Sequence, residues 1–402
     1  MVLIDGVLKN YDWGSPTAIP ELLDLSATGE PVAEVWFGAH WAGPAELRGS
    51  GVRLDEHIDA DRRAALGASV ADRFGSLPFL LKVLAADAPL SLQTHPSAEQ
   101  ARNGYEREEA LGIDRHGARR CFRDRRHKPE LICALSEFSA LCGFREPSET
   151  LELLGTIPTD ALDPIRARIA AVPTPAGIAG LLEWLLRLDR QATADLVGSV
   201  TAACAAQSPS RSASPFAAER QVVSDLGRRY RRDPAVLIAL LLNLVRLRPG
   251  EAIFFGPGNL HCYLRGTGVE LMANSDNVVR AGLTSKHVDV ATLLDIVETD
   301  PMTVDVQRPS AVDGVVSYRS PVEEFSLQRI DLNSAAEVEP GPAILLCTSG
   351  HARLESRAGS HPLGRGAAAW MAASDGPAHL DGTATVFRAG VGPRTDSGPQ
   401  HR

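Results

Sequence analysis

Short apolar runs bounded by glycine or proline occur near both ends of this 402-residue chain, and a section with helical periodicity separates them. Residues 32–37, 78–84 and 131–135 are runs of strand length, and similar runs return after Gly250. Between residues 147 and 245 the apolar positions repeat with a helical period instead. This order predicts a mainly β protein: a β core interrupted by an α insertion and followed by a second, small β domain of the sandwich or barrel type.

The changes of pattern also set the expected domain boundaries. These are residues 1–146 and 246–314 for the main β domain, 147–245 for the helical insertion, and 315–402 for the C-terminal β domain with a frayed tail. Within the insertion, Ser148 is expected to cap the first helix, and the Ser/Pro-rich segment 207–215 is expected to be a mobile loop. A further buried helix is predicted from Pro234 to about Arg248.

Composition argues against several classes of function. The formal net charge of −9 does not fit a protein devoted to nucleic acid or to an anionic membrane surface. The longest apolar stretch, residues 235–245, is shorter than the roughly 18 residues that a membrane span needs. The six cysteines form no CxxC pair and residues 1–15 lack a signal-peptide pattern, so we expect free thiols in a cytoplasmic protein. The basic run 115–128 is expected to be a solvated loop that favours a nearby phosphate.

Two short motifs in the first part of the chain carry side chains that can bind a metal ion. In QTHP, Gln93 and His95 would project from one face of a strand, because side chains alternate with period two. Taken alone, this pattern is more typical of a surface histidine with its hydrogen bonds satisfied. In HKPE, the proline extends the chain, so that Lys128 and Glu130 share one face and His127 the other. A carboxylate entering a buried strand needs a partner, either a metal ion or one of the nearby arginines.

A third motif, GNLHCY, follows an apolar strand and again places two functional side chains, His261 and Tyr263, on one face. A histidine that caps a turn is the alternative for this motif alone. The candidate metal ligands are together Gln93, His95, Glu130 and His261. This mixture of nitrogen and oxygen donors without thiolates suits Zn²⁺ at an open catalytic site, rather than a closed structural one.

A fourth segment, residues 269–286, alternates apolar residues with charges and then enters a polar loop. Its charged residues include Glu270, Asp276 and Arg280. Such groups usually form surface ion pairs, but their density beside His261 favours a lined cleft.

These segments resemble the type I mannose-6-phosphate isomerases. The resemblance rests on QTHP, HKPE, GNLHCY and SDNVVRAGLTSKHVD, with YDWGS at 11–15 and AEVWFGAH at 33–40, and it covers the chain from Leu8 to about Val297. It implies a cupin (jelly-roll) catalytic domain with a helical domain inserted and a second cupin-like domain at the C-terminus. It also implies an aldose–ketose isomerase that interconverts mannose 6-phosphate and fructose 6-phosphate through an enediol(ate), with one Zn²⁺ per chain.

The resemblance assigns roles to individual residues. The zinc ligands fall on Gln93, His95, Glu130 and His261. Lys82, Ser91 and Lys128 fall on substrate-pocket positions, Tyr263, Glu270 and Asp276 line the site, and Arg280 falls on the catalytic arginine. We expect Lys128, Glu270 and Asp276 to take part in catalysis with Arg280, and Tyr263 and His127 to contact the substrate. The general base stays open among Glu270, Asp276, His127 and a lysine, with a preference for a carboxylate. Two departures from the family pattern, the run 121–126 and Trp41, lie beside the site.

Two other functions remain as alternatives at this stage. One is another metal-dependent cupin enzyme, such as an Fe(II) oxygenase or a different sugar isomerase, although Gln93 departs from a two-histidine, one-carboxylate triad. The other is a non-catalytic sugar-binding cupin, which would not need the retained charges of the fourth segment. We expect a sugar phosphate as the ligand, no nucleic-acid or membrane partner, and a monomer.

Overall fold

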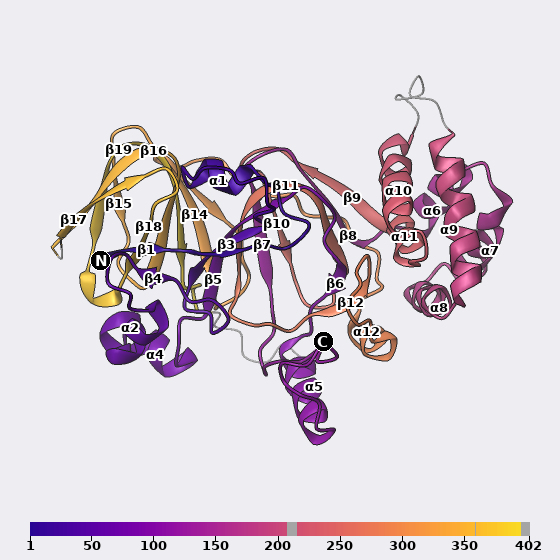
Figure 1. Cartoon of the computed structure of the whole chain (residues 1–402), viewed down its shortest axis with the longest axis horizontal. Helices are drawn as coiled ribbons and strands as arrows, with labels where there is room; N and C mark the ends of the chain where they lie inside the picture. The colour runs from indigo at the N-terminus through magenta and orange to yellow at the C-terminus, as the bar shows by residue number, and fades with distance from the viewer. Residues whose placement is uncertain (207–214, 358, 395–402) are drawn as a thin grey trace.

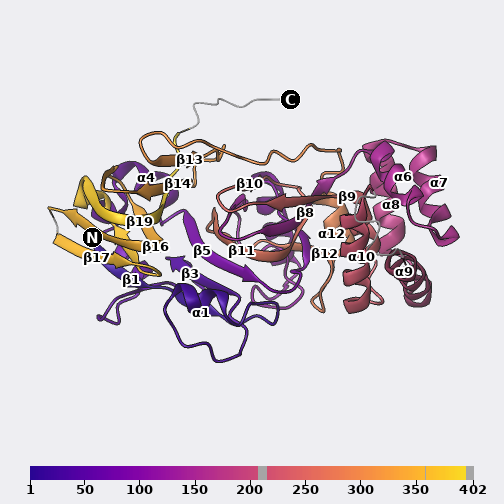
Figure 2. The same cartoon turned by 90° about the horizontal axis from the view of Figure 1, so that it is seen from above.

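The computed structural model describes residues 1–206, 215–357 and 359–394, and it consists of three parts in a row (Figures 1 and 2). A ten-stranded sheet occupies the centre, a nine-stranded sheet lies on one side, and a group of helices lies on the other. The fold class predicted from the sequence, two β units with a helical insertion, is confirmed. Of the helices in these described ranges, none has both the length and the apolar character that a membrane crossing requires.

The central sheet contains the segments that carry the predicted site. Its main path is β10 (Ala252–Phe255), β7 (Glu130–Ala134), β11 (His261–Ala273), β5 (Phe79–Ala86), β3 (Glu34–Gly38) and β2 (Val7–Lys9). The other members are β6 (Leu92–Thr94), β8 (Phe138–Phe144), β9 (Leu242–Leu247) and β12 (Val279–Gly282). The long strand β11 joins the two groups, since its second half pairs with β5 and β7 and its first half with β6 and β8.

The bend in β11 has a visible cause in the sequence. The register shifts between Tyr263 and Arg265, and Gly266 follows with a φ of +123°. A Cβ at Gly266 would lie 2.6 Å from the carbonyl oxygen of Glu137, so only glycine fits there. Runs 262–264 and 269–272, which look separate in the sequence, are therefore one bent strand that turns the sheet into a barrel.

The second sheet is formed mainly by the C-terminal part of the chain. Its strands are β13 (Val315–Tyr318), β14 (Ser326–Leu332), β15 (Ala335–Val338), β16 (Ala343–Ser356), β17 (Gly359–Gly364), β18 (Ala368–Met371) and β19 (Ala378–Gly390), joined by β1 (Val2–Asp5) and β4 (Glu46–Leu47). The pairing of β1 with β18 differs from the predicted division, which placed all of residues 1–146 in the main β domain. The end of the predicted frayed tail, residues 395–402, lies outside the described residues.

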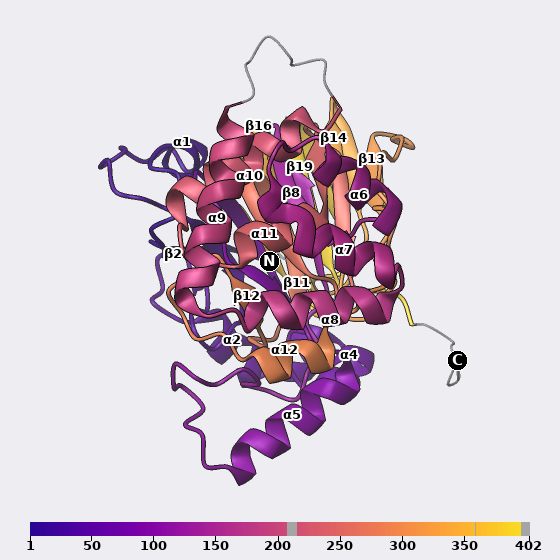
Figure 3. The same cartoon turned by 90° about the vertical axis from the view of Figure 1, so that its right-hand side faces the viewer.

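The helical part begins directly after β8. Its helices are α6 (Pro147–Gly155), α7 (Asp163–Ala171), α8 (Pro175–Leu186), α9 (Arg190–Ala205), α10 (Ala217–Arg229) and α11 (Ala235–Ile238), with 3₁₀ turns η1 (Asp160–Leu162) and η3 (Ala239–Leu241), and they face the viewer in Figure 3. The predicted cap Ser148 is wrong by two residues, because Glu146 is the N-cap and Pro147 takes the first helical position, where its missing N–H is not needed. The predicted mobile loop at 207–215 lies outside the described residues except for Pro215.

The predicted long helix from Pro234 to about Arg248 is also wrong. The chain is helical only as far as Leu241 and then forms β9, which pairs with β8 from Phe144↔Leu242 to Phe138↔Leu247. A continuous apolar run does not distinguish a buried helix from a buried strand, and the open edge of β8 decides between them.

Further helices lie around the β units. They are α1 (Ala18–Leu22), α2 (Leu54–Ala60), α3 (Arg62–Leu66), α4 (Ala68–Phe74), α5 (Ala98–Ala110), α12 (Val290–Ile296) and the 3₁₀ turn η4 (Ala373–Asp375). Helix α5 starts with a capping box, in which Ser97 accepts from the N–H of Gln100 and the Gln100 side chain accepts from the N–H of Ser97. This helix follows the QTHP motif directly and so fixes the chain just beyond it.

The strands of the central sheet are buried on both faces, but the two faces have different chemistry. On β5, Leu81 and Val83 point into an apolar core shared with the C-terminal sheet, where they meet residues such as Leu346 and Trp370. Lys82, between them, points to the opposite face, because side chains alternate along a strand. The C-terminal sheet therefore covers one face of the central sheet and leaves the other to form the interior of the central barrel.

The shared core generates a stability prediction. Leu81→Ala should lower the free energy of unfolding by about 2–5 kcal/mol, because Leu81 is fully buried between the two sheets. The matched change Leu25→Ala, at a side chain that is half exposed, should stay within about 0.5 kcal/mol. Chemical denaturation of both variants measures the difference, and equal effects would contradict a shared core.

Candidate metal centre

Three side chains from three separate segments converge in the barrel interior. The ligand atoms of His95, Glu130 and His261 all lie within 4.8 Å of one another, and all three residues are buried. His95 follows β6, Glu130 begins β7, and His261 begins β11. Each therefore sits at the end of a strand, where the sheet fixes the backbone and the side chain points into the open end of the barrel.

The two imidazoles are oriented by backbone carbonyls. The Nδ1 atom of His95 lies 2.7 Å from the carbonyl oxygen of Asn277, and the Nδ1 atom of His261 lies 3.0 Å from that of Asn259. A carbonyl only accepts, so each Nδ1 carries the proton and each Nε2 offers a lone pair. This is the arrangement found around metal-binding histidines.

The free Nε2 atoms support a metal site. In the described part of the chain neither of them has a hydrogen-bond partner, although both are buried. Each lies 3.4 Å from one oxygen of Glu130, which is beyond the usual hydrogen-bond range of about 2.7–3.2 Å. Two ligand atoms about 2.0–2.1 Å from one Zn²⁺ ion at the tetrahedral angle stand about 3.4 Å apart. The residues present fit a zinc ion.

Gln93 is brought to the same place by strand pairing. Gln93 lies directly opposite His261 on β11 and opposite Arg280 on β12, so the three side chains leave the same face of the sheet in one row. Its Oε1 accepts a hydrogen bond from the hydroxyl of Ser91 at 3.1 Å. Ser91 therefore orients the amide of Gln93, on the face of the sheet that also carries His261.

The electrostatics keep the cluster ready for a cation. Burial and the positive charge of Lys128 lower the pKa of His95 to about 4, so its ring is neutral at pH 7. Burial acts in the opposite sense on Glu130, but Lys128 and the two histidines outweigh it and hold the pKa of Glu130 well below its usual range. A neutral imidazole and an ionised carboxylate are the forms that bind metal ions.

Glu130 also has the ion-pair partner that the sequence suggested as an alternative, although the partner is Lys128 and not an arginine. The Nζ atom of Lys128 lies 2.7 Å from Oε1 of Glu130. The neighbouring His127 points the other way, as side-chain alternation predicts, and its Nε2 lies 2.7 Å from Oε1 of Glu324 on the segment that leads into β14. The structure therefore does not bring this expected substrate-binding residue to the metal ligands.

A second buried cluster lies deeper in the barrel, around Lys82. Its Nζ atom is 3.2 Å from Glu270 and 3.7 Å from Glu34, and Tyr263 donates a hydrogen bond to Glu270 at 2.9 Å. Glu34 accepts a further bond from the indole of Trp36 at 2.6 Å. Burial disfavours the charged lysine, but the two carboxylates outweigh it and raise the pKa of Lys82.

The mouth of the site is positively charged on one side. Among the described residues, Arg280 has no hydrogen-bond or ion-pair partner for its guanidinium group, and burial lowers its pKa. Burial and the neighbouring cations Arg280 and Arg123 lower the pKa of Lys286. Asp276 lies at the same mouth, 3.4 Å from Nε2 of His40. Its carboxyl is partly buried, which disfavours the charge, but His40 holds the pKa of Asp276 below its usual value.

Three residues around the site were not predicted from the sequence. Glu34 lies in the recognised segment AEVWFGAH but has no metal-ligand spacing, Lys286 stands six positions after Arg280, and Asn277 is one of several polar residues in a loop. Asn277 is fully buried, and its side chain accepts from the N–H groups of Arg123 and Asp124. It thereby ties the loop before HKPE to the carbonyl that orients His95.

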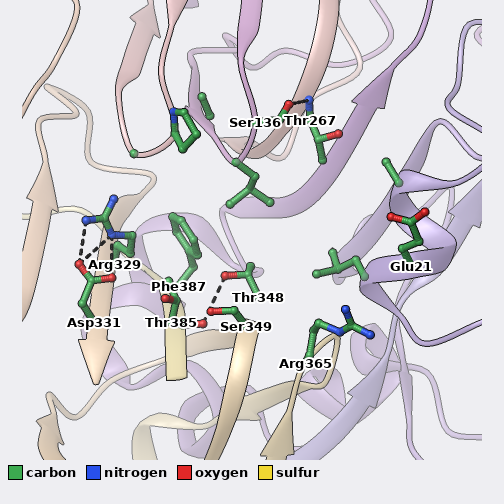
Figure 4. Close-up of a pocket in the computed structure, with 16 residues that line it drawn as sticks. Glu21, Ser136, Thr267, Arg329, Asp331, Thr348, Ser349, Arg365, Thr385 and Phe387 are labelled. Atoms are coloured by element: carbon green, nitrogen blue, oxygen red, sulfur yellow. Dashed lines mark hydrogen bonds and ion pairs between the residues drawn. The ribbon is translucent and has the colours of Figure 1, made fainter. Parts of the chain in front are cut away.

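The metal cluster is separate from a hollow between the two sheets. This cavity of about 470 Å³ is drawn in Figure 4, and none of the predicted site residues, all of which are described, lines it. Of its two arginines, Arg329 pairs with Asp331 at 2.7 Å and Arg365 with Asp24 at 3.7 Å, and the backbone N–H of Thr267 donates a hydrogen bond to the hydroxyl of Ser136. At the barrel mouth, by contrast, Arg280 lies on β12 directly opposite Gln93 of β6.

The metal centre predicts a specific binding defect. His261→Ala should reduce bound zinc from about one equivalent per chain to a small fraction, because it removes one of three converging ligands. His116→Ala, at an exposed histidine outside the cluster, should keep full zinc content. Metal analysis of both proteins after dialysis against zinc-free buffer measures this, and full zinc content in His261→Ala would contradict the site.

Comparison with known proteins identifies the family. The model of the type I phosphomannose isomerase catalytic domain matches residues 1–147. A mannose-6-phosphate isomerase of Escherichia coli (strain K12) is 35% identical over 394 residues, covering 96% of this chain and 98% of its own length, and mannose-6-phosphate isomerase 1 of Arabidopsis thaliana is 30% identical over 96% of this chain and 93% of its own.

A solved structure of mannose 6-phosphate isomerase from Salmonella typhimurium, bound to fructose 6-phosphate and zinc, superposes with a TM-score of 0.90. It is 33% identical in sequence and covers 98% of this chain and 100% of its own. The likeness extends over both β parts and the helical part. The chain belongs to the type I phosphomannose isomerase family.

Proposed function

We propose that this protein interconverts mannose 6-phosphate and fructose 6-phosphate, and that it does so with one zinc ion held by Gln93, His95, Glu130 and His261. The observation that carries the proposal is the pair of buried, unpartnered Nε2 atoms, each 3.4 Å from a Glu130 oxygen. Family membership and the substrate and zinc bound to the Salmonella relative favour this function over an Fe(II) oxygenase or a non-catalytic sugar-binding cupin.

The reaction sets three requirements. A proton must leave C2 of the open-chain aldose and arrive at C1, the oxygen atoms of the enediol(ate) must be stabilised, and the phosphate dianion must be anchored. A bound zinc ion supplies a Lewis acid that polarises sugar oxygens. The remaining requirements fall to the side chains of this chain.

We propose Glu270 as the general base. Burial raises its pKa, Lys82 acts against this, and the nearby carboxylates Glu130 and Glu34 add to it. A carboxyl group with a raised pKa is a stronger proton acceptor than an exposed one. Asp276 is the second candidate, but His40 lowers its pKa and so makes it a weaker base.

The cations Arg280 and Lys286 at the barrel mouth suit the anionic end of the substrate. Arg280 shares a face of the sheet with Gln93, and burial lowers the pKa of Lys286, which lies close enough to Arg280 for the charge of the arginine to lower it further. An arginine remains protonated at neutral pH, so Arg280 can stabilise the enediolate or bind the phosphate but cannot act as the base. Lys128, 2.7 Å from Glu130, is placed to contact a sugar oxygen beside the metal ligands.

The cysteines and the exposed apolar side chains bear on localisation and assembly. The cysteines of the described residues are free and buried, which suits a reducing cytoplasm. Leu111 and Val312, the two most exposed large apolar side chains of the described residues, are far apart in the sequence, and we propose that the protein is a monomer. The sugar phosphates could then serve either GDP-mannose synthesis or mannose catabolism.

The first functional prediction concerns the metal. The purified protein should form fructose 6-phosphate from mannose 6-phosphate in a coupled assay, lose activity with a chelator and regain it with Zn²⁺. Activity that survives complete zinc removal would contradict a metal-dependent reaction.

A related prediction concerns Arg280. Arg280→Ala should reduce kcat by about 10²–10³-fold with zinc content unchanged, because the loss of one preorganised charge in an active site typically has an effect of this size. A near-normal kcat would show that Arg280 does not take part in the mechanism.

The second functional prediction concerns pH. A base works only when deprotonated, so kcat/KM should fall as the pH drops through the raised pKa of Glu270 and should be full above it. Glu270→Gln should lose about 10²–10⁴-fold in kcat. Asp276→Asn should lose much less and keep the acidic limb of the profile. The reverse ranking would make Asp276 the base.

A further inference from the structure

One carboxylate of the helical part is bonded to the turn that follows Arg280. Asp233 lies between α10 and α11, and its Oδ2 accepts a hydrogen bond from the backbone N–H of Leu283 at 2.7 Å. The N–H of Thr284 bonds to the same carboxyl group, and Oδ1 accepts from the N–H of Ala235 at 2.9 Å. Asp233 therefore joins the start of α11 to residues 283–284 of the catalytic unit through main-chain groups.

The backbone of this turn is in a conformation that needs support. Leu283 has a φ of +53°, in the left-handed region that residues other than glycine rarely adopt. Gly282 has a φ of +147°, and a Cβ there would lie 2.4 Å from Oδ1 of Asp233. The glycine thus permits the close approach of the carboxylate, and the carboxylate holds the leucine in an unfavourable conformation.

Packing holds this turn on one side only. A hollow of about 870 Å³ borders it, and the lining includes Gly282, Thr284 and Ser285 from the turn and Asp233 from the helical part. Leu283 itself is buried in the core that also contains Ala235 and Val236. On the side that faces the hollow, hydrogen bonds to Asp233 hold the main chain of the turn.

The turn connects Arg280 and Lys286, two cations of the site. Arg280 lies on β12, two residues before Gly282, and Lys286 lies two residues after Thr284. The register of β12 with β6 already shifts between Arg280 and Gly282, so the sheet does not hold the strand beyond Arg280 in regular pairing. Figure 3 shows β12 beside α11, and Ala235 at the start of α11 is close to Gly282.

From these contacts we infer that Asp233 is a positioning residue for the isomerase reaction: it fixes the turn 282–284 and thereby the places of Arg280 and Lys286. The inference rests on the role of Arg280 in the proposed function and extends it. It makes the helical insertion a working part of the active site, because the insertion supplies the carboxylate that the turn needs.

The chemistry of Asp233 supports positioning rather than direct contact with substrate. Both carboxylate oxygens are used by backbone N–H groups. The flanking Arg231 and Arg232 are exposed, and among the described residues Asp233 makes no ion pair with either. An asparagine at this position keeps one acceptor and replaces the other with a donor, which would face an N–H group.

Kinetics of Asp233→Ala and Asp233→Asn test the inference. Asp233→Ala should lower kcat/KM for fructose 6-phosphate by about 10–100-fold with zinc content unchanged, because a small displacement of a charged group is enough to do so. Asp233→Asn should lose less of its kcat/KM, since it retains one of the hydrogen bonds.

The matched control is Asp189→Ala, which removes the aspartate that caps α9 through the N–H groups of Gln191 and Ala192 in the same helical part. It should lower Tm and leave kcat/KM within about twofold.

A double-mutant cycle with Arg280→Ala separates positioning from general damage. If Asp233 acts through the Arg280 turn, adding Asp233→Ala to Arg280→Ala should change kcat/KM, and the Kd for fructose 6-phosphate measured by calorimetry, by much less than it does in the wild-type protein. Equal fold losses in both backgrounds, or an Asp233→Ala protein no more impaired than Asp189→Ala, would overturn the inference while leaving the proposed function intact. A near-normal Arg280→Ala enzyme would overturn both the role of Arg280 and the inference.

Discussion

The structure depends on the placement of one ionised carboxylate inside a protein. Glu130 is almost fully buried at the start of β7, and burying such a charge without partners is strongly unfavourable. Lys128 at 2.7 Å and two imidazoles at 3.4 Å surround it, and the imidazoles present lone pairs rather than protons. The lone pairs of the imidazoles and the carboxylate face one another, and a zinc ion fits the space that these atoms leave. The charge of Glu130 thus accounts for the nearby lysine and suits a bound cation.

The charged interior of the central sheet also explains why the protein has more than one β unit. The strands around the site carry charged residues on the inner face, where Lys82, Glu270 and Glu34 form a second compensated cluster. Their other face is apolar and would be exposed without the C-terminal sheet, which buries it in a shared core. On the opposite side, the helical part supplies Asp233 to the turn after Arg280. The C-terminal sheet and the helical part therefore both make contacts that stabilise the catalytic barrel.

Much of the candidate site could be predicted because it is encoded locally. QTHP, HKPE and GNLHCY each place two functional residues two positions apart in extended chain, and the alternation of side chains then fixes which of them share a face. The direction of His127, away from Glu130 and toward Glu324, follows from this rule. The fold class was predictable for a similar reason, since strand and helix periods differ. The end of the helix after Pro234 was not, because the apolar residues 235–245 satisfy either period until β8 offers them a partner.

The sequence by itself determined which groups could bind a metal ion, that the chain is mainly β with a helical insertion, and the family to which the motifs point. Only the tertiary structure decided that the ligand atoms of His95, Glu130 and His261 meet within 4.8 Å, that β1 pairs with the C-terminal sheet, and that Asp233 reaches the turn at Leu283. The physical reason is the range of the interactions. Side-chain alternation and turn chemistry act over a few residues, whereas these contacts join segments that are distant along the chain, and their geometry exists only after the sheets have paired.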